Sequence, residues 1–196
     1  MAAGSSSRMN GIKQLLPWKK SNLLLHAVET LQQVQKEHTY VVLGANYDTI
    51  LKQSNIDSFP VALIQNTNWK KGLGNSIACG IAHILEQKVA YDGILVCLAD
   101  QPLLDSNYYK ELIGLFKLGK QAVVATKYAK NVGVPAIFNK VRSRELLTLN
   151  ADNGAKQLLM RYATDTNTLN PGNKISDIDT RVEYQKLYRQ YNENNN

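Results

Sequence analysis

Apolar residues recur at two different periods along this chain. Helical spacing, with an apolar residue at every third or fourth position, occurs in two segments, at Leu24, Val28, Leu31 and Val34 and again at Ile77, Ile81 and Ile84. Ser21 precedes the first of these helices as its predicted N-cap. Further helices are predicted over residues 105–117, 143–149, 155–163 and 180–191.

Short runs of β-branched and other apolar residues alternate with these helices. They predict strands within residues 39–45, 61–66, 93–102, 122–127 and 134–138. The run "GILVCL" is almost continuously apolar, which is typical of a strand in a sheet covered on both faces. Strands that alternate with helices favour a three-layer α/β fold with a mostly parallel sheet.

Length and composition are those of one globular domain. The 196 residues, 44% hydrophobic and 20% charged, suffice for a single large core. We expect the domain to span residues 1–192 and a disordered tail to occupy 193–196. No apolar run approaches the length of about 18 residues that predicts a membrane span, and no signal peptide is visible.

The net charge and the cysteine content indicate which partners and which cellular compartment to expect. The formal net charge is +7, but the lysines are scattered and no arginine-rich arm is present, so nucleic acid is not a predicted partner. A mildly basic surface would favour a small substrate that carries phosphate. Cys79 and Cys97 lie in apolar contexts without metal or redox spacing and are predicted to be reduced core thiols, which favours a cytoplasmic protein.

The unusual residues follow the predicted strands. Ligands of parallel α/β sheets bind beyond the carboxyl ends of the strands. Two polar or glycine-rich segments lie directly after predicted strands: "NTNWKKGLGNS" follows "VALIQ", and "ADQP" follows "GILVCL". Two segments of similar composition lie elsewhere: "AAGSSSR" opens the chain, and "DIDT" precedes the last helix.

Each segment also has a purely structural interpretation. Ser76 is expected to be a helix N-cap, while Gly72 and Gly74 allow close approach of the backbone to a ligand without forming a dinucleotide fingerprint. Asp100 ends a buried strand and needs a partner, for which a cation is natural. Asp179 is either a ligand or the cap of the last helix. The three histidines share no ligand spacing and are predicted to be structural, and "GAKQ" at residues 154–157 is not a P-loop.

Taken together, "AAGSSSRM", "KQLLPW", "NTNWKKGLGNSIACGI", "VCLADQPLL", "GVPAIF", "NGAKQLL" and "DIDT" resemble the MobA-like nucleotidyltransferases. The closest likeness is to the molybdenum cofactor cytidylyltransferases. The resemblance implies a Rossmann-like sheet that transfers a nucleotidyl group from an NTP to a phosphorylated acceptor and releases pyrophosphate. CTP is the implied donor and molybdopterin the implied acceptor, with a molybdoenzyme or its chaperone as a further partner.

The resemblance also implies residue roles. Backbone amides of the opening loop would hold phosphate oxygens, and Arg8 and Lys13 would neutralise the triphosphate and the leaving pyrophosphate. Asp100 and Asp179 would hold Mg²⁺, with Asp177 assisting, and Asp100 is also counted with Arg8 and Lys13 as catalytic. The complete implied nucleotide-binding set is Ala2, Ala3, Gly4, Ser5, Ser6, Arg8, Lys13, Asn66, Gly72, Gly74 and Ser76. The implied acceptor-binding set is Gln101, Pro102, Gly133 and Pro135.

Some positions depart from the family pattern. Asn10 replaces a common glycine, residues 151–153 read "ADN" where the family often has "GD" before "GA", and Glu183 replaces a common aspartate. None of these removes an implied ligand. Two alternatives therefore remain open: a guanylyl-type or sugar- or alditol-phosphate nucleotidyltransferase, and a non-catalytic cofactor-binding or chaperone module.

The beginning of the chain carries one more expectation. The resembling family has a central apolar strand before "AAG", and a strand needs about five residues, yet only Met1 and Ala2 precede Ala3. We therefore expect the native chain to carry apolar residues upstream, and the chain as given to have an open apolar slot in its sheet.

Overall fold

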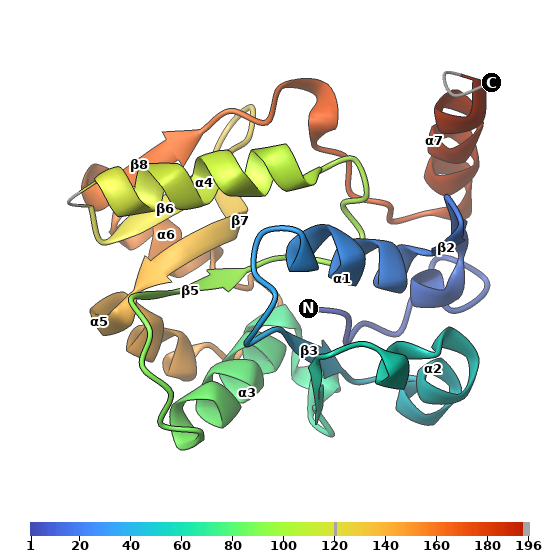
Figure 1. Cartoon of the computed structure of the whole chain (residues 1–196), viewed down its shortest axis with the longest axis horizontal. Helices are drawn as coiled ribbons and strands as arrows, with labels where there is room; N and C mark the ends of the chain where they lie inside the picture. The colour runs from blue at the N-terminus through green and yellow to red at the C-terminus, as the bar shows by residue number, and fades with distance from the viewer. Residues whose placement is uncertain (120, 194–196) are drawn as a thin grey trace.

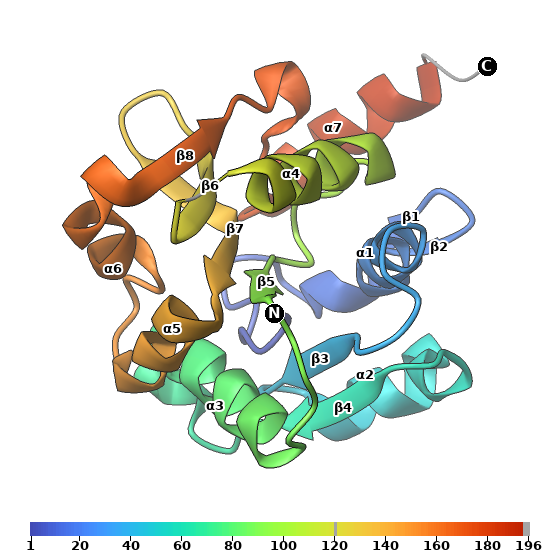
Figure 2. The same ribbon diagram turned by 60° about the vertical axis from the view of Figure 1, so that its left-hand side comes forward.

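Two groups of strands form the centre of the molecule (Figures 1 and 2). The computed structural model describes residues 1–119 and 121–193. In the first group β3 (Tyr40–Leu43) pairs in parallel with β4 (Ala62–Gln65). In the second, four strands lie in the order β5 (Gly93–Val96), β7 (Val132–Asn139), β6 (Val123–Lys127) and β8 (Thr166–Leu169).

The first residues of the chain lie between the two groups. The Met1 ammonium donates to the Cys97 carbonyl oxygen at 2.8 Å, and the Ala99 amide donates to the Met1 carbonyl at 3.1 Å. On the other side the Ala2 amide donates to the Val42 carbonyl at 2.9 Å, as part of a parallel bridge to Leu43. These bonds place β3 and β5 in the same direction on either side of one short connection.

Strand β7 alone runs against this direction among the described strands of the two groups. It pairs antiparallel with both β5 and β6, whereas β6 and β8 are parallel. The sheet is therefore mixed but mostly parallel, and the predicted α/β, Rossmann-like class is confirmed.

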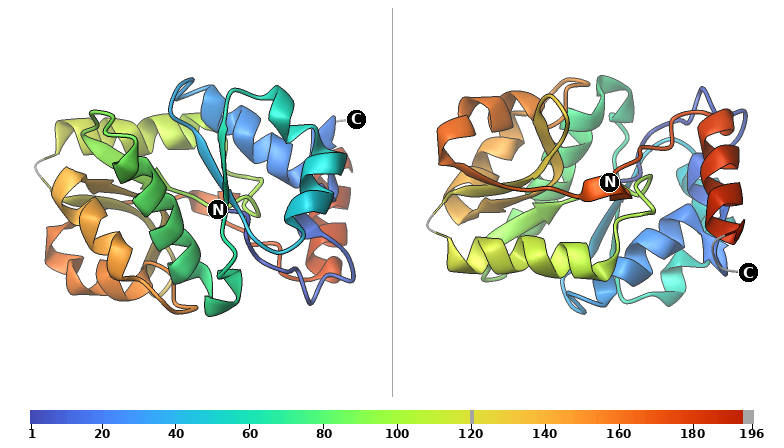
Figure 3. Two further views of the ribbon diagram at one scale, coloured as in Figure 1. Left: turned by 90° about the horizontal axis from the view of Figure 1, so that it is seen from below. Right: turned by 90° about the horizontal axis from the view of Figure 1, so that it is seen from above.

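Helices cover both faces of the sheet (Figure 3). Successive side chains of β6 point to opposite faces of the sheet. Val123 and Ala125 pack toward α3 and α6, whereas Val124 packs toward α4. Helix α1 lies on the α4 side, where Leu24 and Val28 meet β3. The α-helices are α1 (Leu23–Gln32), α2 (Tyr47–Ser54), α3 (Leu73–Glu86), α4 (Ser106–Leu118), α5 (Lys140–Ser143), α6 (Lys156–Arg161) and α7 (Arg181–Glu193).

Several predicted boundaries need correction. The N-cap of α1 is Asn22 rather than Ser21, because the Asn22 side chain accepts from the Leu25 amide at 2.9 Å. The helix predicted over 143–149 divides into the end of α5 and a 3₁₀ turn at Arg144–Thr148. Glu193, assigned to the tail, belongs to α7, and the rest of that tail, 194–196, lies outside the described residues.

Other elements were not predicted. They are α2, β8 and a short hairpin of β1 (Pro17–Trp18) with β2 (Ser21–Asn22). The hairpin buries Trp18 completely against α7, and the Tyr184 hydroxyl donates to the Pro17 carbonyl at 2.7 Å. In the part of the chain that the structure describes, no helix has the length and apolar character needed to cross a membrane.

Candidate active site

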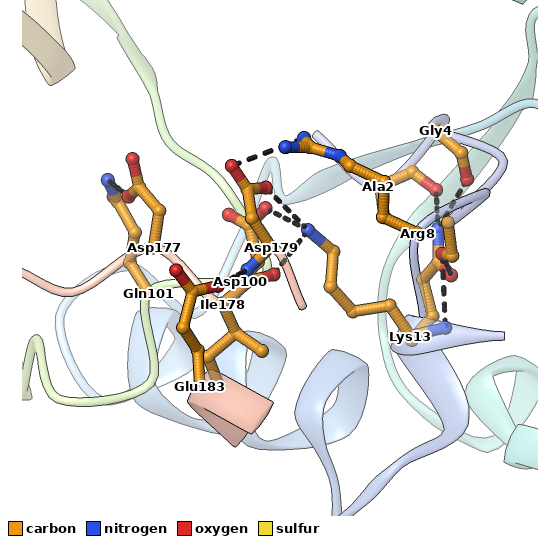
Figure 4. A network of polar contacts seen from close by, with 12 residues as sticks. Ala2, Gly4, Arg8, Lys13, Asp100, Gln101, Asp177, Ile178, Asp179 and Glu183 are labelled. Carbon is orange, nitrogen blue, oxygen red and sulfur yellow. Dashed lines mark hydrogen bonds and ion pairs between the residues drawn. The ribbon is translucent and has the colours of Figure 1, made fainter. Parts of the chain in front are cut away.

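A cleft of about 550 Å³ opens where the strands end. Four segments that are distant in the sequence contribute to it: the opening loop, the turn before α3, the residues after β5 and the segment before α7. These are the segments singled out in the sequence. Figure 4 shows the polar side chains that meet across the cleft.

Gln14 organises the opening loop from behind. Its side-chain amide donates to the carbonyl oxygens of Ala2 at 2.8 Å and Gly4 at 3.1 Å, and its Oε1 lies 3.2 Å from the Ser6 hydroxyl. Ser6 takes a left-handed conformation, with φ of 57°, and its hydroxyl also accepts from the Lys13 amide. Gln14 is only 4% exposed, so the loop is fixed by a buried amide.

Gln14 was not among the residues predicted from the sequence. The available signal was a polar residue directly before the apolar "LL" of "KQLLPW", at a position that packs inward. A buried amide at such a position must find hydrogen-bond partners, and an irregular loop offers free carbonyl groups.

Lys13 lies at the centre of the charged network. Its Nζ is 2.6 Å from Asp100 Oδ2 and 3.6 Å from Asp179 Oδ1, and it also donates to the Ile178 carbonyl at 2.7 Å. The Lys13 side chain is 17% exposed and that of Asp100 21%. One ammonium group therefore joins the strand end after β5 to the segment before α7.

Asp179 faces the cleft rather than capping the last helix. Its Oδ2 lies 3.3 Å from the guanidinium of Arg8. The cap is Thr180: the Glu183 amide lies 3.2 Å from the Thr180 hydroxyl, and Glu183 Oε2 accepts from the amides of Thr180 and Asp179. This is a capping box. Glu183 therefore has a structural role in the capping box at the position where the family commonly has an aspartate.

Asp177 is exposed at its surface side, but its carboxyl group contacts the buried Gln101 beside the cations. The Gln101 side-chain amide donates to Asp177 Oδ1 at 2.7 Å and to the Tyr128 hydroxyl at 2.8 Å, and that hydroxyl donates to the Val134 carbonyl. Burial raises the pKa of Asp177 above its ordinary value, and the carboxylates of Asp100 and Asp179 raise it further. The Gln101 hydrogen bond acts in the opposite direction.

Hydrogen bonds from the buried Asn66 side chain hold the turn before α3 in place. Asn66, 3% exposed, donates through its side-chain amide to the Ser76 hydroxyl at 3.0 Å, and its Oδ1 accepts from the Asn68 amide. Helix α3 begins at Leu73 with Gly72 as its N-cap. The prediction that Ser76 caps this helix is therefore wrong: Ser76 lies in its first turn, where its hydroxyl reaches back to the Gly72 carbonyl.

The two glycines of this turn are required by packing. Gly72 has φ of +97°, and a Cβ there would lie 2.7 Å from the backbone nitrogen of Asp152. At Gly74 a Cβ would lie 2.7 Å from the Ala151 carbonyl oxygen, which accepts from the Gly74 amide. The 150–154 loop therefore presses directly on the start of α3, and Asp152 reaches the cleft.

The implied site residues divide into three groups. The residues that line the cleft are Ala2, Ala3, Gly4, Ser5, Ser6, Arg8, Lys13, Gly72, Ser76, Asp100, Asp177 and Asp179. Asn66 and Gly74 stand behind this lining and shape it. None of the four acceptor-binding residues is among the residues that line the cleft. Gln101 contacts Asp177 directly, the Pro102 carbonyl accepts from His26 Nε2, Gly133 approaches the Tyr128 ring, and Pro135 follows Val134.

Two carboxylates of the cleft have the surroundings expected of cation ligands. Asp100 Oδ1 is buried and has no hydrogen-bond partner, and Asp100 and Asp179 both contact the Lys13 ammonium. Both observations fit a small divalent ion held by these two carboxylates. Asp177 is turned to Gln101, and within residues 1–119 and 121–193 no three acidic, histidine or cysteine side chains gather in a metal-binding arrangement.

Fold and cleft together define a nucleotide-handling α/β protein, because loop amides and cations at the ends of parallel strands are suited to bind phosphate groups. Residues 1–166 match the MobA-like NTP transferase domain, and the chain belongs to this family. The nucleotidyltransferase class expected from the motifs is thereby confirmed.

Individual proteins show the same likeness. Nicotine blue oxidoreductase of Paenarthrobacter nicotinovorans is 27% identical over 198 residues, which cover 96% of this chain and 93% of that protein. A nucleotidyl transferase from Methanothermobacter thermautotroptrophicus superimposes with a TM-score of 0.80 at 18% identity, covering 98% of this chain and 95% of that one. Molybdopterin-guanine dinucleotide biosynthesis protein A from Archaeoglobus fulgidus gives 0.69 at 11% identity, with coverage of 98% and 96%. The two structures show likeness of fold.

Proposed function

We propose that this protein transfers a cytidylyl group from CTP to the phosphate of a molybdopterin-type acceptor. A phosphate oxygen of the acceptor attacks the α-phosphorus of CTP, the bond from that phosphorus to the bridging oxygen of the β-phosphate breaks, and pyrophosphate leaves. No side-chain nucleophile is required, because a phosphate monoester with a second pKa of about 6 is already anionic at neutral pH.

The observation that carries this proposal is the position of Lys13. Its ammonium lies between Asp100 and Asp179, in the same cleft that the opening loop lines. A triphosphate laid on that loop brings its negative charge to Lys13 and Arg8. Charge that develops on the leaving pyrophosphate is then stabilised by groups that are already in place.

Asp100 and Asp179 would hold a divalent ion, for which we propose Mg²⁺. When bound, this ion supplies positive charge to phosphate oxygens, and Mg²⁺ keeps several coordination positions for phosphate and water. Two protein carboxylates are consequently enough.

Base and acceptor are proposed on the motif likeness. "KQLLPW" and "NTNWKKGLGNS" resemble the cytidylyltransferase branch, and one similar fold belongs to a protein of molybdopterin-guanine dinucleotide biosynthesis. The cluster of Gln101, Asp177 and Tyr128 is linked through Asp177 to the cleft, and we propose that the acceptor phosphate binds next to it. A nucleoside triphosphate substrate and two unpaired cysteines favour a cytoplasmic setting, with a molybdoenzyme or its chaperone as recipient of the product.

A thermal-shift panel of CTP, GTP, ATP and UTP with Mg²⁺ tests the proposal. A specific ligand at 100 times its dissociation constant stabilises the folded protein by about 2.7 kcal/mol. We expect CTP to give the largest shift, Lys13→Met to remove it, and Lys174→Met to retain it. Lys174 is the matched control because it forms a pair of similar length, 2.7 Å, with Asp105 outside the cleft. A preference for GTP would favour the guanylyl alternative, and no shift with any NTP would favour a non-catalytic module.

A further inference from the structure

The side-chain amide of Gln14 bonds to the opening loop through both its nitrogen and its oxygen. Its two N–H groups have two acceptors, the carbonyl oxygens of Ala2 at 2.8 Å and Gly4 at 3.1 Å, and its Oε1 accepts from the Ser6 hydroxyl at 3.2 Å. The opposite orientation of the amide would set Oε1 against both carbonyl oxygens. Gln14 is therefore fixed in one orientation, with the loop carbonyl groups turned toward it.

This arrangement leaves two backbone amides of the loop without a protein acceptor. Because a peptide unit is planar and trans, the N–H that follows a carbonyl group points away from it. The amide of Ala3 follows the Ala2 carbonyl, and the amide of Ser5 follows the Gly4 carbonyl, so both amides point away from Gln14. Among the described residues neither amide has an oxygen to which it donates, and Ala3 and Ser5 both border the cleft. They are donors available to an anion in the cleft.

Gln14 also connects the loop to the central cation of the cleft. The Ser6 hydroxyl that donates to Gln14 Oε1 accepts from the Lys13 amide at 3.1 Å. Lys13 and Gln14 are neighbours in a short 3₁₀ turn, Lys13–Leu15, in which successive side chains point in directions about 120° apart. The Lys13 ammonium consequently meets the carboxylates of the cleft while the Gln14 amide meets the loop. One turn of the chain thus supplies a cation and orients two amide donors.

We propose that Gln14 is a positioning residue for the phosphate chain of the nucleotide. It holds the amides of Ala3 and Ser5 in the orientation in which they donate to phosphate oxygens, and its own amide stays bonded to the loop. This inference rests on the proposed function, because it takes the opening loop as the binding site of the triphosphate. Loss of the Gln14 donors should weaken binding of a bare phosphate chain as much as binding of CTP, since neither base nor acceptor is involved.

Inorganic tripolyphosphate is the probe, because it has the phosphates of an NTP without sugar or base. Gln14→Met keeps the length of the side chain and removes both donors, and Gln14→Glu keeps its shape but, when ionised, sets a carboxylate against two carbonyl oxygens. Thr30→Val is the matched control. Thr30 is 5% exposed, its hydroxyl donates to the His26 carbonyl at 2.8 Å, and it does not line the cleft. Titration calorimetry at a fixed Mg²⁺ concentration gives the affinities, and unfolding curves identify the variants that fold.

We expect both Gln14 variants to bind tripolyphosphate about 10-fold more weakly or worse, because a hydrogen bond to a charged group is worth at least this factor. The affinity for CTP should fall by the same factor, and Thr30→Val should bind both ligands as the wild type does. A folded Gln14→Met with the affinity of the wild type for tripolyphosphate would overturn the proposal and leave Gln14 a structural residue.

Amide resonances of the isotope-labelled wild type test the same claim without any variant. The signals of Ala3 and Ser5 should move when tripolyphosphate saturates the protein, and unmoved signals would overturn the proposal even if no Gln14 variant folds. A wild type that binds CTP but not tripolyphosphate would also overturn it, and the proposed function would stand. A wild type that binds neither would count against both.

Discussion

Among the single residues of the cleft, Lys13 is the one whose charge is shared most widely. Its ammonium contacts the carboxylates of both Asp100 and Asp179. Neutralising either carboxylate therefore changes the negative charge that is available to a cation and the positive charge of Lys13 that is available to phosphate. Asp100 is the more buried of the two, with one oxygen that has no hydrogen-bond partner. Its charge therefore has the larger effect at this site.

The first prediction concerns Asp100→Asn. This nearly isosteric change removes only charge, so the protein should fold normally while turnover falls by about 10²-fold or more, the scale reported for removing one electrostatic group from an active site. Asp179→Asn should act in the same direction. If both serve one ion, the double variant is no slower than the slower single variant. Full Mg²⁺-dependent activity in Asp179→Asn would contradict a shared ion. Steady-state rates and unfolding curves are the measurements.

The second prediction concerns Asp177 and pH. Its pKa is raised in the folded protein, first by burial and then by Asp100 and Asp179. The folded state therefore holds this proton to higher pH than the unfolded state, and ionisation of Asp177 lowers stability as pH rises above the ordinary aspartate range, about 4. Asp177→Asn should remove this loss, since an amide oxygen still accepts from Gln101.

Urea unfolding of both proteins from pH 4 to pH 7 measures the difference. Stability of the wild type relative to Asp177→Asn should fall as pH rises. Parallel curves would show that Asp177 ionises without cost in the folded protein.

Residues differ in how far the sequence alone reveals them. Asp100 was predictable because a carboxylate at the end of an apolar strand requires a partner. Gln14 was not, because its two carbonyl partners, on Ala2 and Gly4, belong to a loop whose path becomes known only in three dimensions. Asp179 carried two interpretations that only the Thr180–Glu183 capping box separates.

At the scale of elements, helix α7 depends on that capping box. Thr180→Ala removes the cap hydroxyl and should lower the free energy of unfolding by about 1 kcal/mol, within a usual range of about 0.5–2. Asp179→Asn should cost less, because the half-exposed Asp179 carboxylate lies 3.3 Å from Arg8 and 3.6 Å from Lys13, both longer than a direct hydrogen bond, and does not cap the helix. Chemical denaturation of both variants checks this. An equal or larger loss for Asp179→Asn would show that Asp179 supports the helix after all.

The start of α3 gives a prediction about glycine. Gly72→Ala combines a positive φ with a backbone contact of 2.7 Å at Asp152, so it should destabilise the protein by roughly 1–3 kcal/mol. Gly114, inside α4, has nothing within 4 Å of a Cβ and is the matched control. Gly114→Ala should stabilise by about 0.5–1 kcal/mol through helix propensity. The two thermal midpoints should move in opposite directions, and a neutral Gly72→Ala would refute the packing role.

Elements were predictable where a long apolar period dominates. Helices α3 and α4 and strands β3 to β7 follow such patterns. Helix α2 did not, because only Ile50 and Ser54 of its residues are buried, and β8, "TNTL", is largely polar and is positioned by its pairing with β6. The β1–β2 hairpin forms around Trp18, whose burial depends on the distant helix α7.

The whole molecule is a nucleotidyltransferase fold in which Met1 and Ala2 bridge the two strand groups. Sequence reasoning reached the layer order and the parallel majority from alternation alone. The antiparallel direction of β7 could not be read in this way, because an apolar run such as "VPAIF" has the same pattern in either direction.

The most direct test of the central claim follows the label of α-phosphate-labelled CTP in the presence of Mg²⁺ and molybdopterin. The account predicts that label appears on the pterin in proportion to the pyrophosphate released, and that Asp100→Asn lowers both signals by about 10²-fold or more while remaining folded. Folded wild-type protein that releases no pyrophosphate from CTP, or Asp100→Asn that transfers label as fast as the wild type, would contradict it.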